Sequence, residues 1–186
     1  RNVMDQKKMK IVIVSSEKPE NINGFERFIR RLEQEDGVET ACLFYSPRQQ
    51  GDLIGEIKAM QPRLLITVNL PGFDRCTLTD GISYNLLDCR QLHLLLHENL
   101  SNEEYLKKQL SIAMFFYCAG NAYYERLKEQ YPNLPYLEKL PDWQAGTDER
   151  TADANAEALY AAFREVLREG FEFSIEPGRY TRMPDT

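Results

Sequence analysis

The sequence predicts a three-layer α/β domain with a doubly wound, mainly parallel sheet of five or six strands. Four apolar runs of strand length each stop at a polar, turn-forming cluster, and at least three of these clusters lead into an amphipathic helix. The runs are continuous rather than alternating, which is typical of strands covered on both faces. Regular alternation of strands and helices implies right-handed crossovers in an open sheet of Rossmann-like or flavodoxin-like type.

Each strand is predicted from a short hydrophobic run bounded by turn residues. In chain order the expected strands are Lys10–Ser15, Glu39–Tyr45, Leu64–Val68, Gln91–His97 and Ile112–Cys118, with a short edge strand within Leu134–Leu140. Pro135 and Pro141 argue against a central position for the last strand, because proline cannot donate to a ladder.

The helices are predicted from apolar spacing and from capping residues. Asn23 with Glu26 has the spacing of an N-cap and its partner acid, and Ser101 with Glu104 repeats that spacing. The expected helices run from Asn23 to Gly37, from Asp52 to Met60, from Ser101 to Leu110, from Asn121 to Tyr131 and from Asp153 to Glu169, where Gly170 is the expected stop.

The domain organisation predicted is a leader at 1–9, a single α/β domain at 10–170 and a tail at 171–186. The segment Asn69–Cys89 is the least regular part of the domain. A long irregular segment inside a compact domain is usually functional, or else contains a short helix, and the sequence leaves both options open.

Composition narrows the classes of partner. The chain has 186 residues, 42% hydrophobic and 28% charged, with a net charge of −6, so no global basic field attracts nucleic acid or an anionic membrane. No apolar stretch approaches the ~20 residues that span a bilayer. The four cysteines are scattered, without metal or disulfide spacing. We expect reduced thiols in a bacterial-type cytoplasm.

Candidate ligand-binding residues follow the strands, because parallel sheets bind ligands at the carboxyl ends of their strands. His97 is the candidate general base, with Glu98 or Asp74 to orient it. A loop hydrogen bond or a plain turn explains the same residues without a ligand. The candidate ligand-binding residues are Ser15, Ser16, Glu17, Asn69, Gly72, Asp74, Gly120 and Asn121.

The two histidines, His93 and His97, are expected on one strand. There they would share a face about 13 Å apart, which is too far for one metal ion, and no metal is expected. Motifs of other enzymes are missing: the sequence contains no G-x-G-x-x-G, no G-x-x-x-x-G-K-[ST] and no G-x-S-x-G. A phosphorylated receiver domain requires acids where Ser15, Ser16 and Asn69 stand. No cofactor is expected.

The run Pro62–Phe73, P-R-L-L-I-T-V-N-L-P-G-F, resembles a core motif of the spore-maturation, CgeB-like group of glycosyltransferase-like proteins. Gly81-Ile82-Ser83 and Phe115-Phe116-Tyr117-Cys118 fit the same group loosely, so the resemblance covers roughly residues 10 to 140. It implies an amino-terminal Rossmann-like half, whereas such enzymes hold the donor's nucleotide diphosphate mainly on a second domain. Leu95-Leu96-His97-Glu98-Asn99 departs from the family pattern.

Three functions remain open. The first is a stand-alone or half-site module of glycosyltransferase type that binds a sugar, a nucleotide-like ligand or a partner protein without catalysing transfer alone. The second is a small enzyme that uses His97 as base. The third is a regulatory protein with tyrosines at an interface. Those tyrosines are Tyr117, Tyr123, Tyr124, Tyr131 and Tyr136.

Overall fold

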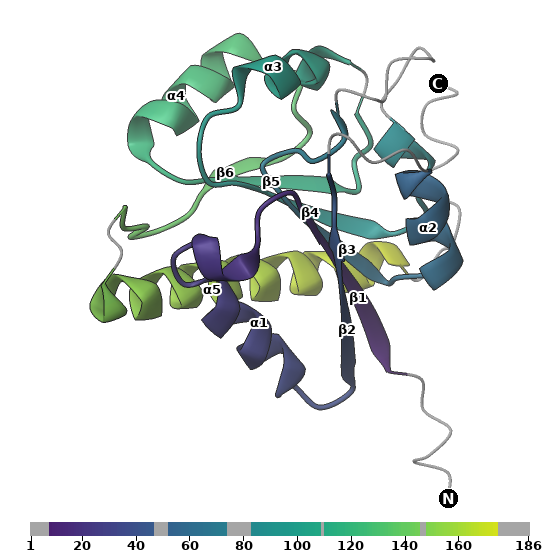
Figure 1. Cartoon of the computed structure of the whole chain (residues 1–186). Coiled ribbons are helices and arrows are strands. Elements are labelled where there is room, and N and C mark those ends of the chain that lie inside the picture. The colour runs from purple at the N-terminus through teal and green to yellow at the C-terminus, as the bar shows by residue number, and fades with distance from the viewer. Residues whose placement is uncertain (1–7, 47–51, 74–82, 109, 146–147, 175–186) are drawn as a thin grey trace, which may run out of the picture.

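A six-stranded, entirely parallel sheet with the strand order β2-β1-β3-β4-β5-β6 forms the centre of the molecule (Figure 1). The computed structural model describes residues 8–46, 52–73, 83–108, 110–145 and 148–174. The strands are β1 (Met9–Ser15), β2 (Val38–Phe44), β3 (Leu64–Val68), β4 (Arg90–Leu95), β5 (Met114–Cys118) and β6 (Leu137–Lys139). The predicted fold class is confirmed.

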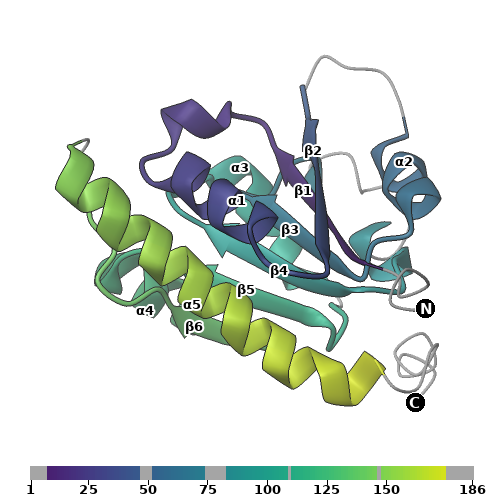
Figure 2. The ribbon, with the colours of Figure 1, turned by 90° about the horizontal axis from the view of Figure 1, so that it is seen from below.

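Helices cover both faces of the sheet. They are α1 (Phe25–Glu33), α2 (Leu53–Met60), α3 (Leu100–Glu103), α4 (Asn121–Gln130) and α5 (Glu149–Ser174), with 3-10 turns η2 (Pro19–Asn21), η4 (Ser83–Leu86) and η5 (Glu104–Lys107). α1 and α5 lie on one face, and α2, α3 and α4 lie on the other (Figures 1 and 2). Each helix layer packs against its own hydrophobic cluster.

The continuous apolar runs correspond to strands that are buried on both sides. Every residue of β3, β4 and β5 is buried. By contrast, β2 contains only partly buried and exposed residues, as expected of a strand at the edge of a sheet. Hydrophobic burial is therefore concentrated in the central strands.

The chain reverses its direction of winding at β1, which lies between β2 and β3. Ser15, the last residue of β1, stands beside Val68, the last residue of β3. Val68 in turn stands beside Leu94 of β4. The segments that follow β1, β3 and β4 therefore emerge together at one edge, and the topological switch point lies between the first two.

Several predicted helix ends are wrong: α1 already ends at Glu33 and α5 already begins at Glu149, and three capping or stop residues were misassigned. The N-cap of α1 is Gly24 with φ +90°, not Asn23, whose side chain donates to Thr151 instead. Asn99, not Ser101, caps α3, which is only one turn long and continues as η5. The last helix continues through Gly170 to Ser174, because a glycine in a helix interior costs only about 1 kcal/mol relative to alanine.

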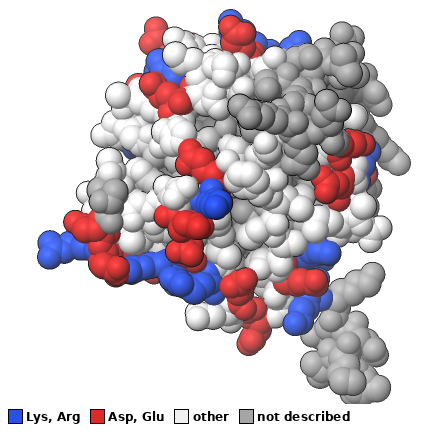
Figure 3. All heavy atoms as spheres, viewed as in Figure 1, with Lys and Arg blue, Asp and Glu red and all other residues white. Residues whose placement is uncertain are grey.

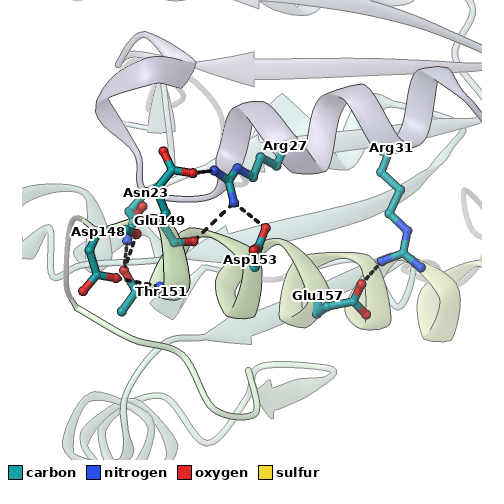
Figure 4. Close-up of polar contacts among 8 residues, drawn as sticks. All are labelled: Asn23, Arg27, Arg31, Asp148, Glu149, Thr151, Asp153 and Glu157. Carbon is teal, nitrogen blue, oxygen red and sulfur yellow. Dashed lines mark hydrogen bonds and ion pairs between the residues drawn. The ribbon is translucent and has the colours of Figure 1, made fainter.

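The packing of α1 on α5 explains why a glycine caps α1. A Cβ at Gly24 would stand 2.7 Å from both the Ala152 carbonyl oxygen and the Asn155 Cβ. Along the rest of this contact Arg27 pairs with Glu149 and Asp153, and Arg31 pairs with Glu157 (Figure 4). The close approach is therefore possible only with glycine at the crossing.

A buried polar chain crosses the opposite face of the sheet. Gln91 donates its Nε2–H to the Tyr84 carbonyl oxygen, so its Oε1 accepts from His93 Nε2 at 2.8 Å. His93 Nδ1 then accepts from the Thr67 hydroxyl at 2.6 Å. Burial lowers the pKa of His93 to about 3, so this histidine is neutral. This series of hydrogen bonds fixes η4 against the sheet through the Tyr84 carbonyl oxygen.

Lys and Arg side chains are interspersed with Asp and Glu on the face shown in Figure 3. Within the ranges that the structure describes, no helix combines the length and apolarity needed to cross a membrane.

Candidate functional site

Four of the predicted ligand-binding or catalytic residues meet at the carboxyl edge of the sheet. Ser15 ends β1 and Glu17 follows it, Asn69 follows β3 and His97 follows β4. Hydrogen bonds connect them across the switch point, although Glu17 and His97 are 80 residues apart in the chain. We call Glu17, Asn69 and His97 the switch-point cluster.

Asn69 is the fixed member of the cluster and is 6% exposed. Its Oδ1 accepts from the backbone N–H groups of Leu96 at 2.8 Å and of His97 at 3.2 Å. These two donors fix the orientation of the side-chain amide, because turning it over would direct its NH₂ at both of them. The Nδ2 atom consequently lies 2.9 Å from His97 Nε2.

The backbone after β3 is strained. Asn69 has φ 58° and Leu70 has φ 55°. Asparagine tolerates this left-handed region, whereas for leucine it costs roughly 1–2 kcal/mol. Burial of Leu70, which is 1% exposed, offsets this cost. Such strain occurs at functional sites more often than elsewhere.

Two asparagines that the sequence reasoning missed support this strained turn. Asn99 Nδ2 donates to the Asn69 carbonyl oxygen at 3.3 Å, and Asn102 Nδ2 donates to the Leu70 carbonyl oxygen at 2.8 Å. The N-x-x-N spacing after β4 was the available signal. The turn is therefore held from β4 as well as from its own strand.

Ser15 does not present its hydroxyl to a ligand. The hydroxyl donates to the Glu17 carbonyl oxygen at 2.7 Å and accepts from the Glu17 N–H at 3.1 Å. This local turn sets the direction of the Glu17 side chain. Ser16, between them, is half-buried.

His97 pairs with an acid, but not with the predicted one. Its Nε2 lies 3.0 Å from Glu17 Oε1, and the two side chains are 58% and 40% exposed. The prediction that Glu98 orients His97 is wrong, because Glu98 lies 2.8 Å from Arg126 instead.

Arg126 joins Glu98 to a buried carboxylate that the sequence reasoning missed. Glu103 is 0% exposed and accepts two hydrogen bonds from Arg126, at 2.9 and 3.0 Å. The Tyr123 hydroxyl donates to the same carboxylate at 3.0 Å. The hydrogen bonds to Glu103 raise the pKa of Arg126, which stays charged. This pair fixes α4 to α3 beside the switch-point cluster.

The other predicted ligand-binding residues lie outside the hydrogen-bonded cluster. Gly72 has φ +75°, and a Cβ there would approach Leu53 at 3.1 Å, so packing explains this glycine. Gly120 and Asn121 are exposed at the start of α4, where Gly120 with φ +94° is the N-cap. Asp74 lies outside the described residues.

The predicted tyrosine interface is wrong for its main members. Tyr117, Tyr123 and Tyr131 are buried, between 3% and 8% exposed. Tyr124 and Tyr136 are partly buried and pack against the two core clusters. These rings stabilise the core rather than forming an exposed aromatic face.

Metal and thiol chemistry receive no support from the described ranges. In that part of the chain no group of three or more His, Cys, Asp or Glu side chains is placed to hold a metal ion. Cys42, Cys89 and Cys118 are free thiols, and burial raises the pKa of Cys118 to about 12. Cys76 lies outside the described residues.

A hollow of about 260 Å³ lies away from the switch-point cluster, between η2 and the first turns of α1 and α5. Asn23, Arg27, Glu149 and Ala152 are among the residues that line it. None of the predicted site residues does. Arg27 is already paired there with Glu149 and Asp153.

Comparison of the chain with protein-family models, with curated proteins and with solved structures finds no match.

Proposed function

We propose that this chain is a ligand-binding module of glycosyltransferase type that holds the sugar part of a ligand at the switch-point cluster and does not catalyse transfer alone. The parallel sheet and its switch point support this proposal, because ligands of open α/β sheets bind at that position. The chemistry of the cluster favours a ligand that carries hydroxyl groups.

The observation that carries the proposal is a hydrogen-bond conflict at His97 Nε2. This atom lies 2.9 Å from the Asn69 NH₂ group and 3.0 Å from the Glu17 carboxylate. If Nε2 carries a proton, it faces the N–H of Asn69. If Nε2 carries a lone pair, it faces the oxygen of Glu17. One of the two contacts is therefore unfavourable in either neutral tautomer.

A ligand hydroxyl resolves this conflict. The hydroxyl can accept a hydrogen bond from Asn69 Nδ2 and donate one to the Glu17 carboxylate. His97 Nε2 then no longer has to face both groups. Glu17 is 40% exposed, so its side chain can move aside without opening the core. The negative charge of Glu17 disfavours a phosphate at this point, which supports the sugar ring rather than the diphosphate as the occupant.

The test is a binding measurement by calorimetry with three groups of probes: nucleotide sugars, the matching free sugars and the matching nucleoside diphosphates. We expect binding of the nucleotide sugar or the free sugar, weakened about tenfold or more by Glu17→Gln or His97→Phe. Glu98→Gln is the matched control, because Glu98 is paired with Arg126 and should leave the affinity unchanged. Absence of sugar binding to the wild type, or equal effects of Glu17→Gln and Glu98→Gln, would contradict the proposal.

A second candidate is a small enzyme in which Glu17 orients His97 as a general base. The 3.0 Å contact between the two side chains favours it, with Glu17 in the role predicted for Glu98. Turnover of a bound sugar, followed by NMR and lost in His97→Gln without a change in affinity, would support the enzyme over the binding module.

A further inference from the structure

The edge strand β2 has backbone groups along its outer side that pair with no strand among the described residues. The Gly37 carbonyl oxygen accepts from Met9 N–H, and Tyr45 N–H donates to the Ser15 carbonyl oxygen. In a parallel pair alternate residues bond to the neighbouring strand, so the odd-numbered residues of β2 point toward β1. The N–H and C=O groups of Thr40, Cys42 and Phe44 therefore point away from the sheet. No described helix or strand lies beyond β2 (Figure 2).

The two edges of the sheet differ in their protection. β6 is three residues long, contains Glu138 and Lys139, and lies between Pro135 and Pro141. Short length, charge and proline are the usual devices that prevent edge pairing. β2 has seven residues, and none of its residues from Thr40 to Phe44 is charged. The side chain of Phe44 is 56% exposed there.

We propose that two copies of this chain associate through β2, as antiparallel edge strands related by a two-fold axis at Ala41. Ala41 is the midpoint of β2, so this register uses the whole strand. Thr40 then stands opposite Cys42 of the other copy, and their outward N–H and C=O groups bond reciprocally. Val38 stands opposite Phe44 of the other copy, which covers the exposed ring.

The two-fold register is favourable for the side chains on both faces of the sheet. Val38, Thr40, Cys42 and Phe44 share the α1 face, because Thr40 Oγ1 lies 3.4 Å from Glu33 of α1. On the other face Ala41 meets its own copy, and Glu39 stands opposite Leu43 rather than another acid. A second copy therefore fits without any like-charge pair in the strand.

Charges on α1 support a second copy as the occupant. Glu33 lies beside Thr40, near the proposed axis, and the exposed Arg30 lies one helical turn earlier. The axis brings two carboxylates and two guanidinium groups together, so Arg30 of each copy can pair with Glu33 of the other. The arrangement is electrically balanced and self-complementary, as an isologous interface requires.

The test is sedimentation equilibrium of the wild-type chain from low micromolar to several hundred micromolar concentration. Edge pairing buries little surface, so we expect a concentration-dependent dimer of modest affinity. Phe44→Lys should weaken dimerisation by about tenfold or more, because an edge lysine opposes strand pairing. Leu86→Lys is the matched control, since Leu86 is 58% exposed and lies outside β2, and it should dimerise like the wild type.

A charge swap tests the axis without altering β2. Arg30→Glu and Glu33→Arg should each weaken the dimer, because each places four like charges near the axis. The double variant Arg30→Glu/Glu33→Arg should restore it. A monomeric wild type at every concentration, an equal effect of Leu86→Lys, or no rescue in the double variant would overturn the proposal. Circular dichroism of each variant confirms that the fold is retained.

The register has its own covalent test. Thr40→Cys places a thiol opposite Cys42 of the other copy, at the roughly 5.5 Å Cα separation that a disulfide spans. Mild oxidation should therefore yield covalent dimers of Thr40→Cys, and Thr40→Cys/Cys42→Ser should yield none. Cross-linking that persists in the second variant would overturn the register.

Discussion

Asn155 of α5 and Gln144 of the segment before it exchange two hydrogen bonds. Asn155 Oδ1 accepts from the Gln144 N–H at 2.7 Å, and Asn155 Nδ2 donates to the Gln144 carbonyl oxygen at 2.8 Å. The same Nδ2 group also donates to the Asn23 carbonyl oxygen at 3.2 Å. One side chain, 0% exposed, thus joins three segments around the start of α1.

We expect Asn155→Ala to lower the free energy of unfolding by roughly 2–3 kcal/mol, because it removes three hydrogen bonds that a fully buried side chain makes to the backbone of Gln144 and Asn23. Urea unfolding measures the change. Asn121→Ala is the control, since Asn121 is exposed and its loss should change stability by less than about 0.5 kcal/mol. Equal effects of the two variants would refute the role of Asn155.

Two glycines separate the effect of backbone conformation from that of close packing. Gly24 and Gly37 both have positive φ, but a Cβ at Gly37 meets open space, whereas at Gly24 it clashes with α5. Gly37→Ala should cost about 1 kcal/mol, and Gly24→Ala should cost at least about 2 kcal/mol more. Thermal and urea unfolding of both variants test this difference; similar losses would show that α1 can move away from α5.

The buried His93 predicts how stability depends on pH. Burial lowers its native pKa to about 3, from the ordinary histidine pKa of 6.5. Below about pH 6.5 the unfolded chain binds a proton that the native state does not, so protonation favours unfolding. As the pH falls from about 6.5 toward 3, the free energy of unfolding should therefore decrease by up to about 1.4 kcal/mol per pH unit because of His93.

The measurement is urea unfolding at several pH values between 7 and about 4. His93→Asn should reduce the change in the free energy of unfolding per pH unit. His97→Gln should leave that change as it is in the wild type, because the buried His93 is retained. A slope that is unchanged in His93→Asn would show that His93 does not cause it.

Arg126 is the cation that pairs with the buried carboxylate of Glu103, so its removal should destabilise the fold strongly. Arg126→Met leaves the carboxylate of Glu103 buried without its cation, and the free energy of unfolding should fall by roughly 3–5 kcal/mol. Glu98→Gln removes the exposed partner and should cost less than about 1 kcal/mol. A small effect of Arg126→Met in chemical unfolding would mean that Glu103 is neutral or hydrated in the native state.

The strands were predictable from the sequence because their burial leaves a local pattern. Leu64–Val68 matches β3 at both ends, and Lys10–Ser15 differs from β1 by one residue. The predicted strand Gln91–His97 was too long, because the apolar run continues past the last ladder residue Leu95 into the turn that Asn69 binds.

The helix starts and the acid of the cluster were not predictable from local spacing. The N-cap at Gly24 depends on α5, which lies more than 120 residues later in the chain. Glu98 was chosen because it adjoins His97, whereas the fold brings Glu17 there from another strand. Contacts between segments far apart in the sequence determine both the N-cap of α1 and the acid that pairs with His97, and no short sequence motif indicates such contacts.

The long helix α5 packs against α1 and β4, and it completes the hydrophobic cluster on that face of the sheet. Leu159 and Phe163 pack in the same cluster as Ile11 and Phe25. During synthesis on the ribosome, this cluster is consequently covered only in part, by α1, until residues 149–174 have emerged. We therefore expect this hydrophobic layer to be complete only after α5 has left the ribosome.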